Sequence, residues 1–191
     1  MIDVFLMGTA GSYDDPKRPL WREPIKEACR KLGISCFDPV VPVWNEDAQA
    51  HEVEAMVEAK VIVMGITAHT ASIASLAESG WAALSAIKRK QAFGLFVDTM
   101  FLGEGFDVTM SQASMDIVQY LLNSKETNDE MTEASRRARK LVEGHAQELA
   151  KDFPDLNLFI ASSPRALRDW TIETVQRMKA AGEIGNESSS K

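Results

Sequence analysis

The stretch Val61-Ile62-Val63-Met64-Gly65-Ile66 decides the fold class. It is a continuous apolar run rich in β-branched residues. A strand with one face in water alternates apolar and polar residues, whereas a strand buried on both faces does not. The run therefore predicts a strand within a sheet that helices cover on both sides. A helical pattern follows it, beginning at Thr70 or Ser72 and extending to about Lys88.

Short apolar runs and helical patterns alternate through the rest of the chain. Further strands are predicted at Ile2–Met7, Ser35–Phe37, Ala92–Val97 and Asn157–Ile160. Further helices are predicted at Trp21–Leu32, Glu46–Ala59 (capped by Asn45), Met110–Leu122, Thr127–Lys151 and Pro164–Ala181. This alternation is typical of an α/β fold with a parallel sheet and right-handed crossovers. We expect one domain over residues 1–181 and a disordered tail over 182–191, which is rich in Gly, Ser and Glu.

The composition argues against two classes of partner. The chain has 191 residues, 45% of them hydrophobic, and a formal net charge of −7. An acidic chain lacks the basic footprint that displaces counterions, so we expect no nucleic-acid polymer as a partner. Its charge-free stretches are shorter than the roughly 20 residues of a membrane span, so we expect no membrane partner.

The cysteines and histidines form no visible metal-ligand pattern. Cys29 and Cys36 lack CxxC spacing, and the three histidines are dispersed through the chain. We therefore expect buried thiols in a reducing cytoplasm, and neither a metal nor another cofactor. The N-terminus has no basic segment of the kind that begins a signal peptide, which also favours a cytoplasmic location.

Glu78 is the most unusual residue of the chain. It is the only formally charged residue between Lys60 and Lys88, in a helical segment rich in Ile, Leu, Ala and Trp. We expect so apolar a helix to be largely buried, and a buried carboxylate needs hydrogen bonds or a polar cavity. Ser72 and Ser75 precede it on the same predicted helix. The alternative is an ordinary glutamate that faces solvent.

The loop after the first predicted strand is a candidate ligand-binding segment. It reads Gly8-Thr9-Ala10-Gly11-Ser12, without the GxGxxG or GK[ST] patterns of dinucleotide and triphosphate sites. Its small residues allow the backbone to approach a ligand, and Arg18 or Arg22 could bind a phosphate or carboxylate. The alternative is a flexible loop with solvated arginines.

Four further residues fall near the ends of predicted strands, where parallel sheets bind ligands. Asp38 and Asp98 are either turn residues or the partner carboxyl that Glu78 needs for acid–base chemistry. Trp44 could stack on a planar ring, although aromatic side chains often only pack. His69 precedes the helix that carries Glu78 and could donate a hydrogen bond to a ligand, or it could be an ordinary loop residue.

The order of these motifs resembles the nucleoside 2-deoxyribosyltransferase superfamily, in particular its transferase-like branch. The resemblance covers roughly residues 1–122, through the GTAGS loop, Trp21-Arg22, Phe37-Asp38-Pro39 and the segment SIASLAESGWAA. It implies a flavodoxin-like three-layer fold with a five-stranded parallel sheet, to which this chain adds C-terminal helices. It also implies a small-molecule nucleoside or nucleotide as the ligand.

The resemblance implies a role for several residues. Glu78 matches the family's nucleophile, which attacks the anomeric carbon of a 2′-deoxynucleoside. Ser72 matches a serine that faces the 5′-phosphate in the related nucleoside-monophosphate N-glycosidases. Gly8, Thr9 and Gly11 correspond to a loop that contacts the ligand. Asp98 or Asp38 would protonate the leaving base.

Three functions stay open at this point. They are deoxyribosyl transfer between bases, hydrolysis of a nucleoside 5′-monophosphate, and nucleotide binding without catalysis. Transferases usually carry Asp at the position of Ser72, and many members carry Asp at the position of Lys60. The missing aspartates support the third function, whereas Ser72, Arg18 and Arg22 favour the second. Deoxyribosyl transfer is the leading hypothesis.

Two further expectations concern assembly and protonation. The apolar stripe of the helix at 127–151 predicts a homodimer or larger homo-oligomer through the C-terminal helices. For Glu78, desolvation should raise the pKa, while the helix N-terminus and the hydroxyls of Ser72 and Ser75 should lower it. We expect these effects to offset each other.

Overall fold

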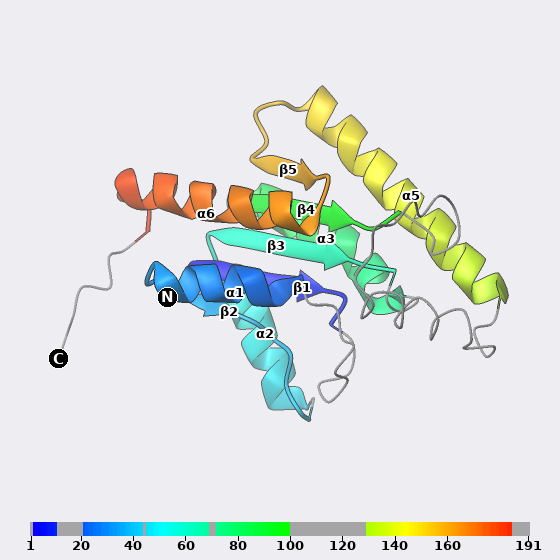
Figure 1. The fold of residues 1–191 in the computed structure, drawn as a ribbon, viewed down its shortest axis with the longest axis horizontal. Helices are drawn as coiled ribbons and strands as arrows, with labels where there is room; N and C mark the ends of the chain where they lie inside the picture. The colour runs from blue at the N-terminus through cyan, green and yellow to red at the C-terminus, as the bar shows by residue number, and fades with distance from the viewer. Residues whose placement is uncertain (1, 11–20, 44, 69–71, 100–128, 185–191) are drawn as a thin grey trace, which may run out of the picture.

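The computed structural model describes residues 2–10, 21–43, 45–68, 72–99 and 129–184. Strands and helices alternate along the chain, as Figure 1 shows. The strands are β1 (Val4–Gly8), β2 (Cys36–Phe37), β3 (Val61–Ile66), β4 (Ala92–Val97) and β5 (Leu158–Ala161). The helices are α1 (Arg22–Lys31), α2 (Glu46–Glu58), α3 (Ile73–Arg89), α5 (Asp129–Asp152) and α6 (Pro164–Ala180). The predicted helix at Met110–Leu122 lies outside the described residues.

The five strands form one parallel sheet in the order β2-β1-β3-β4-β5. β3 lies at its centre, with Gly65 beside Gly8 of β1 and Val61 beside Ala92 of β4. All six residues of β3 are buried, as its unbroken apolar run predicts. The flavodoxin-like three-layer fold is therefore confirmed.

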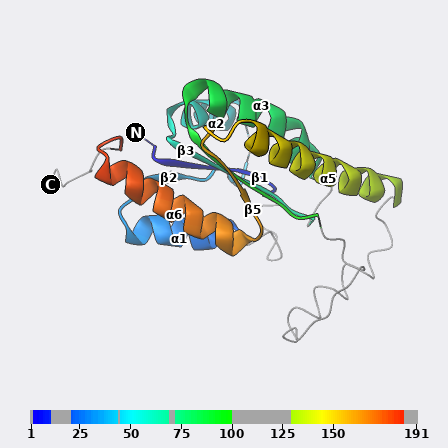
Figure 2. The ribbon, with the colours of Figure 1, turned by 90° about the horizontal axis from the view of Figure 1, so that it is seen from above.

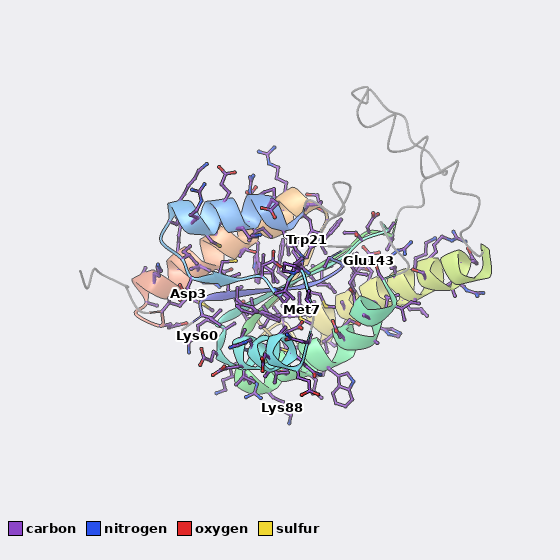
Figure 3. All side chains as sticks on the ribbon, turned by 90° about the horizontal axis from the view of Figure 1, so that it is seen from below. Asp3, Met7, Trp21, Lys60, Lys88 and Glu143 are labelled. Atoms are coloured by element: carbon purple, nitrogen blue, oxygen red, sulfur yellow. The ribbon has the colours of Figure 1, made fainter. Side chains whose placement is uncertain are left out.

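Helices cover both faces of the sheet, and Figure 2 shows the two outer layers. α1 and α6 pack on one face, around Trp21, Ile25 and Leu167. α2, α3 and α5 lie on the other face, where Ala55 and Ala82 reach the core. Figure 3 shows Trp21 and Met7 on opposite sides of the sheet.

A close contact between α1 and the sheet fixes the start of the loop after β1. The indole of Trp21 lies so close to Gly65 that a Cβ there would be 2.5 Å from Cε2 of Trp21. Gly8 has φ +104°, and a Cβ there would be 2.2 Å from the carbonyl oxygen of Gly65. Both positions therefore require glycine. Trp21 Nε1 also donates to the carbonyl of Thr9 at 3.0 Å.

Local capping explains where two helices begin. The side chain of Asn45 accepts a hydrogen bond from Ala48 N at 2.9 Å, so α2 begins where its cap predicts. Ser163 Oγ accepts from Ala166 N at 3.1 Å, and Pro164 fills the first position of α6.

Two expectations about burial are wrong. α3 buries only Ser75, Ala82 and Ala86, and Leu76 is partly buried against the core. The other large apolar side chains of α3 are exposed: Ile73, Trp81, Leu84 and Ile87. Residues 182–184, assigned above to a disordered tail, belong to the folded structure, because Ile184 is 2% exposed and packs on the α1/α6 side. Cys29 is buried as expected and Cys36 is half-buried, both as free thiols. No helix in the described part of the chain is long and apolar enough to cross a membrane.

Candidate functional site

The candidate site lies where β1 and β3 end, at the point where the strand order reverses. The chain leaves β1 toward β2 on one side, and β3 then pairs with β1 on the other side. Parallel sheets with this topology bind ligands in the crevice outside this point. Thr9 and Ser72, which follow these two strands, therefore face the position where a ligand is expected.

A hydroxyl network joins the two strand ends. Thr9 Oγ1 lies 2.7 Å from Ser72 Oγ, and both side chains are buried. Ser72 Oγ donates to the carbonyl of Thr67 at 2.7 Å, and Thr67 N donates to Thr9 Oγ1 at 3.1 Å. The loop after β1, the end of β3 and the beginning of α3 are thereby fixed relative to one another.

Ser72 has an unusual backbone conformation. Its φ of 51° and ψ of 30° are left-handed, a region that non-glycine residues seldom occupy. Such a conformation costs on the order of 1 kcal/mol and persists only where the surroundings impose it. The hydroxyl network provides that constraint, and strained residues of this kind cluster at ligand sites.

Arg22 is held inside the protein. Its Nη1 donates to the carbonyl of Leu6 at 3.1 Å and to Asp38 Oδ1 at 2.8 Å, and its Nη2 donates to the carbonyl of Gly8 at 2.8 Å. The side chain is 4% exposed, and burial lowers its pKa although Asp38 opposes the shift. These contacts favour a structural role, in which Arg22 fixes the end of β1, over binding of a phosphate.

Asp38 shares this ion-paired cluster. Its second oxygen, Oδ2, lies 3.1 Å from Lys26 Nζ, and Oδ1 also accepts from Val40 N at 3.4 Å. Asp38 thus joins Lys26 and Arg22 of α1 to the segment after β2. These contacts favour a structural role for Asp38.

The side chain of Glu78 is exposed on α3, so the expectation of a buried carboxylate is wrong and the alternative of a glutamate that faces solvent holds. The charges of Glu52 on α2 and of Arg22 act on it from a distance. Its pKa is raised, first because partial burial disfavours the charge and second because of the negative charge of Glu52 on α2. The positive charge of Arg22 opposes the increase. The expected balance between raising and lowering effects is therefore wrong, because Glu52 adds a like charge that the linear sequence does not place beside Glu78.

Asp98 belongs to a second cluster at the end of β4. Its Oδ2 accepts from Ala68 N at 3.4 Å, and its charge acts on Arg139 of α5. Arg139 is 3% exposed and donates to Ser135 Oγ at 2.6 Å. Burial lowers the pKa of Arg139 and Asp98 opposes that shift. Glu52 and Arg22, and not Asp98, are the charges that act on Glu78.

The structure thus brings several predicted residues to one edge of the sheet. Gly8, Thr9, Arg22, Asp38 and Ser72 are linked by direct contacts, and Glu78 lies within electrostatic reach of Arg22. Ser75 is buried in α3. The predicted site residues outside the described part of the chain are Gly11, Arg18, Trp44 and His69.

Four residues that contact or influence the candidate site were not among the predicted site residues. Trp21, Thr67, Glu52 and Arg139 act through contacts between distant segments. Only Trp21 carried a signal, because an indole next to Arg22 at the start of a predicted helix is unusually placed for a solvent-facing side chain.

A separate cavity lies where β4 and β5 begin, away from the strand ends that form the candidate site. It has a volume of about 470 Å³ between the end of α3 and β5, with Phe93, Leu156 and Leu158 in its wall. It holds none of the predicted site residues, and its lining is mostly apolar. We assign no function to it.

Within the described residues, no group of three or more His, Cys, Asp or Glu side chains is placed to hold a metal ion. No model of a known protein family matches this chain, and no curated protein is significantly similar to it.

Proposed function

We propose that this protein is an enzyme that cleaves the N-glycosidic bond of 2′-deoxynucleosides and transfers the sugar to another base. The observation that carries the proposal is the placement of Glu78. Its carboxylate lies on the helix that begins at the Thr9–Ser72 contact, with Arg22 near enough to act on its charge. An anion at the point where the strand order reverses can stabilise the oxocarbenium-like state of glycosidic cleavage.

In the proposed reaction a Glu78 oxygen attacks C1′ of the deoxynucleoside. A C–O ester bond forms as the C1′–N bond breaks, and the departing base takes the bonding electron pair and a proton. A nitrogen of a second base then attacks C1′, the ester bond breaks, and the new base loses its proton. Two displacements at one carbon give overall retention of configuration.

The remaining residues of the site have supporting roles in this proposal. In this proposal the paired hydroxyls of Thr9 and Ser72 contact the sugar, and Gly8 lets the backbone approach it. Asp98, or a water molecule, supplies the proton to the leaving base. Arg22 and Asp38 hold the end of β1 in position. The reaction needs no cofactor.

A nucleoside 5′-monophosphate N-glycosidase is the second candidate, and one observation favours it. The two hydroxyls of Thr9 and Ser72 stand together at the N-terminus of α3. Neutral donors at a helix N-terminus suit a phosphate, which a carboxylate at the position of Ser72 would repel. Water would then replace the second base.

Product analysis separates the candidates. The protein is incubated with a deoxynucleoside and a second free base, and separately with a deoxynucleoside 5′-monophosphate alone. Formation of the new deoxynucleoside supports the transferase, and release of base and sugar phosphate supports the hydrolase. Ligand binding with no product in either reaction would support the third function, nucleotide binding without catalysis. Glu78→Gln should abolish whichever activity is found, while Glu143→Gln on α5 serves as the matched control.

A further inference from the structure

The outer side of the α2/α3 layer exposes large apolar side chains, which we call the α2/α3 face. Its members are Val53 and Val57 on α2 and Ile73, Trp81, Leu84 and Ile87 on α3. Trp81 is 75% exposed, Ile73 62% and Leu84 47%. Figure 2 shows that these two helices lie on the same side of the sheet. Monomeric proteins seldom expose apolar side chains at this density.

The exposed residues of α3 form one continuous stripe. Ile73, Trp81 and Leu84 follow the spacing of a single helix face, with Ala77 and Gly80 between them. At about 100° per residue, this stripe lies opposite Ala82 and Ala86, which face the sheet. It therefore points directly away from the core of its own subunit.

α2 gives a second and independent observation. Ala55 is the only residue of this helix that is buried. A helix of 13 residues is marginal in water on its own, because most of its stability comes from packing an apolar face. Val53 and Val57 therefore stay exposed within the described part of the chain, and a second surface that covered them would stabilise α2.

We propose that the α2/α3 face pairs with the same face of a second copy of this chain, about a two-fold axis near Trp81. This proposal places the interface on α2 and α3 instead of on the C-terminal helices expected from the sequence. It goes beyond the proposed function and does not depend on it. Trp81 is the middle residue of α3, so an axis there would place the two α3 helices antiparallel and stack the two indoles. Ala77 and Gly80 beside it are small enough for close approach, since a Cβ at Gly80 would meet no atom within 4 Å.

The distribution of charge fits this antiparallel pairing. α2 and α3 run in the same direction, since each returns from the end of one parallel strand to the beginning of the next. α2 begins with Glu46 and Asp47 and has no basic residue in its last turn, whereas α3 ends with Lys88 and Arg89. The two-fold axis would bring the basic end of each α3 to the acidic start of the partner's α2.

The size of the face sets how much of a dimer interface it can supply. α2 and α3 have 13 and 17 residues, so at about 1.5 Å per residue they are about 20 and 25 Å long. Two such helices side by side, each about 10 Å wide, present a projected area of about 450 Å², so an interface that buries roughly 800 Å² per partner would use the whole face and the surface beside it.

The first test is sedimentation of the full chain at micromolar concentration. We expect a two-chain species, and we expect Trp81→Asp to raise its dissociation constant by at least about 30-fold, as for a central hot-spot residue. Leu141→Asp is the matched control, because Leu141 on α5 is also exposed, at 59%. It should change the constant less than about 3-fold. A monomeric wild-type chain, or dissociation by Leu141→Asp alone, would overturn the proposal.

A cross-linking test locates the axis without removing an apolar side chain. Gly80→Cys should form a disulfide-linked dimer under mild oxidation, because two copies of residue 80 would meet near the axis. Gly144→Cys on α5 is its control, since a Cβ there also meets no atom within 4 Å. The wild-type chain reports any linkage through Cys29 or Cys36. Equal cross-linking of both variants would contradict the proposed axis.

Discussion

The side-chain oxygens of Thr9 and Ser72 lie 2.7 Å apart, although 63 residues separate them in the sequence. This contact joins the end of β1 to the start of α3 across the point where the strand order reverses. It also supports the left-handed backbone of Ser72 and, through Thr67, the end of β3. The contact therefore fixes the start of α3, the helix that carries Glu78.

We expect Thr9→Val to destabilise the protein by about 1–3 kcal/mol, the cost of leaving a buried donor without its acceptor. Valine matches the shape of threonine but cannot accept the hydrogen bond from Thr67 N. Thr9→Ser keeps the hydroxyl and should retain most of the stability. Urea unfolding measures both variants. Equal stability of Thr9→Val and the wild type would show that the network contributes nothing to folding.

Glu78→Gln should preserve the fold and lower turnover by several orders of magnitude, because an amide oxygen is a poor nucleophile at C1′. Intact-mass analysis with a deoxynucleoside should detect a sugar adduct on the wild-type chain and none on the variant. Glu143→Gln should behave like the wild type. Activity of Glu78→Gln within a few-fold of wild type would remove Glu78 from the mechanism.

The raised pKa of Glu78 also predicts how this residue affects stability with pH. Burial and Glu52 disfavour its charge in the folded state, so the folded pKa lies above the ordinary value of 4.5. Its contribution to stability is thus fully present below that value and is lost as pH rises through the folded pKa. Glu78→Gln should raise Tm at pH 8, and the difference should vanish near pH 4. Calorimetry at the two pH values checks this, with Glu143→Gln as the control.

Much of the fold could be predicted, because its strongest signals are local. The apolar runs of β3 and β4 have the predicted bounds, and Asn45 caps α2 as expected. The burial of α3 could not be predicted. An apolar helix is compatible with the core of one chain and with an interface between two, and only the packed structure distinguishes them.

The candidate site was predictable in position but not in its charges. Strand ends identify Thr9 and Asp98, since parallel strands end at one edge of the sheet. Whether an arginine is free for a ligand depends on contacts across the fold. Arg22 is occupied by the carbonyls of Leu6 and Gly8 and by Asp38, and no local pattern reveals this.

We expect Arg22→Met to cost about 3 kcal/mol of stability, because Asp38 and two buried carbonyls lose a cationic donor. Lys26→Met removes the other cation at Asp38, but Lys26 is 37% exposed and should cost less than about 1 kcal/mol. Denaturant titration compares the two variants. A fully stable Arg22→Met whose activity on a nucleoside monophosphate is lost would instead assign Arg22 to phosphate binding.

The pH dependence of kcat/KM should identify the proton donor. Glu78 must be ionised to attack, so its raised pKa places the acidic limb above the ordinary glutamate value. The alkaline limb reports the group that protonates the leaving base, and Asp98→Asn should move that limb if Asp98 has this role. Asp38→Asn should leave the limb in place, because Asp38 is ion-paired with Arg22 and Lys26. An alkaline limb that neither substitution moves would make water, or the substrate itself, the source of the proton.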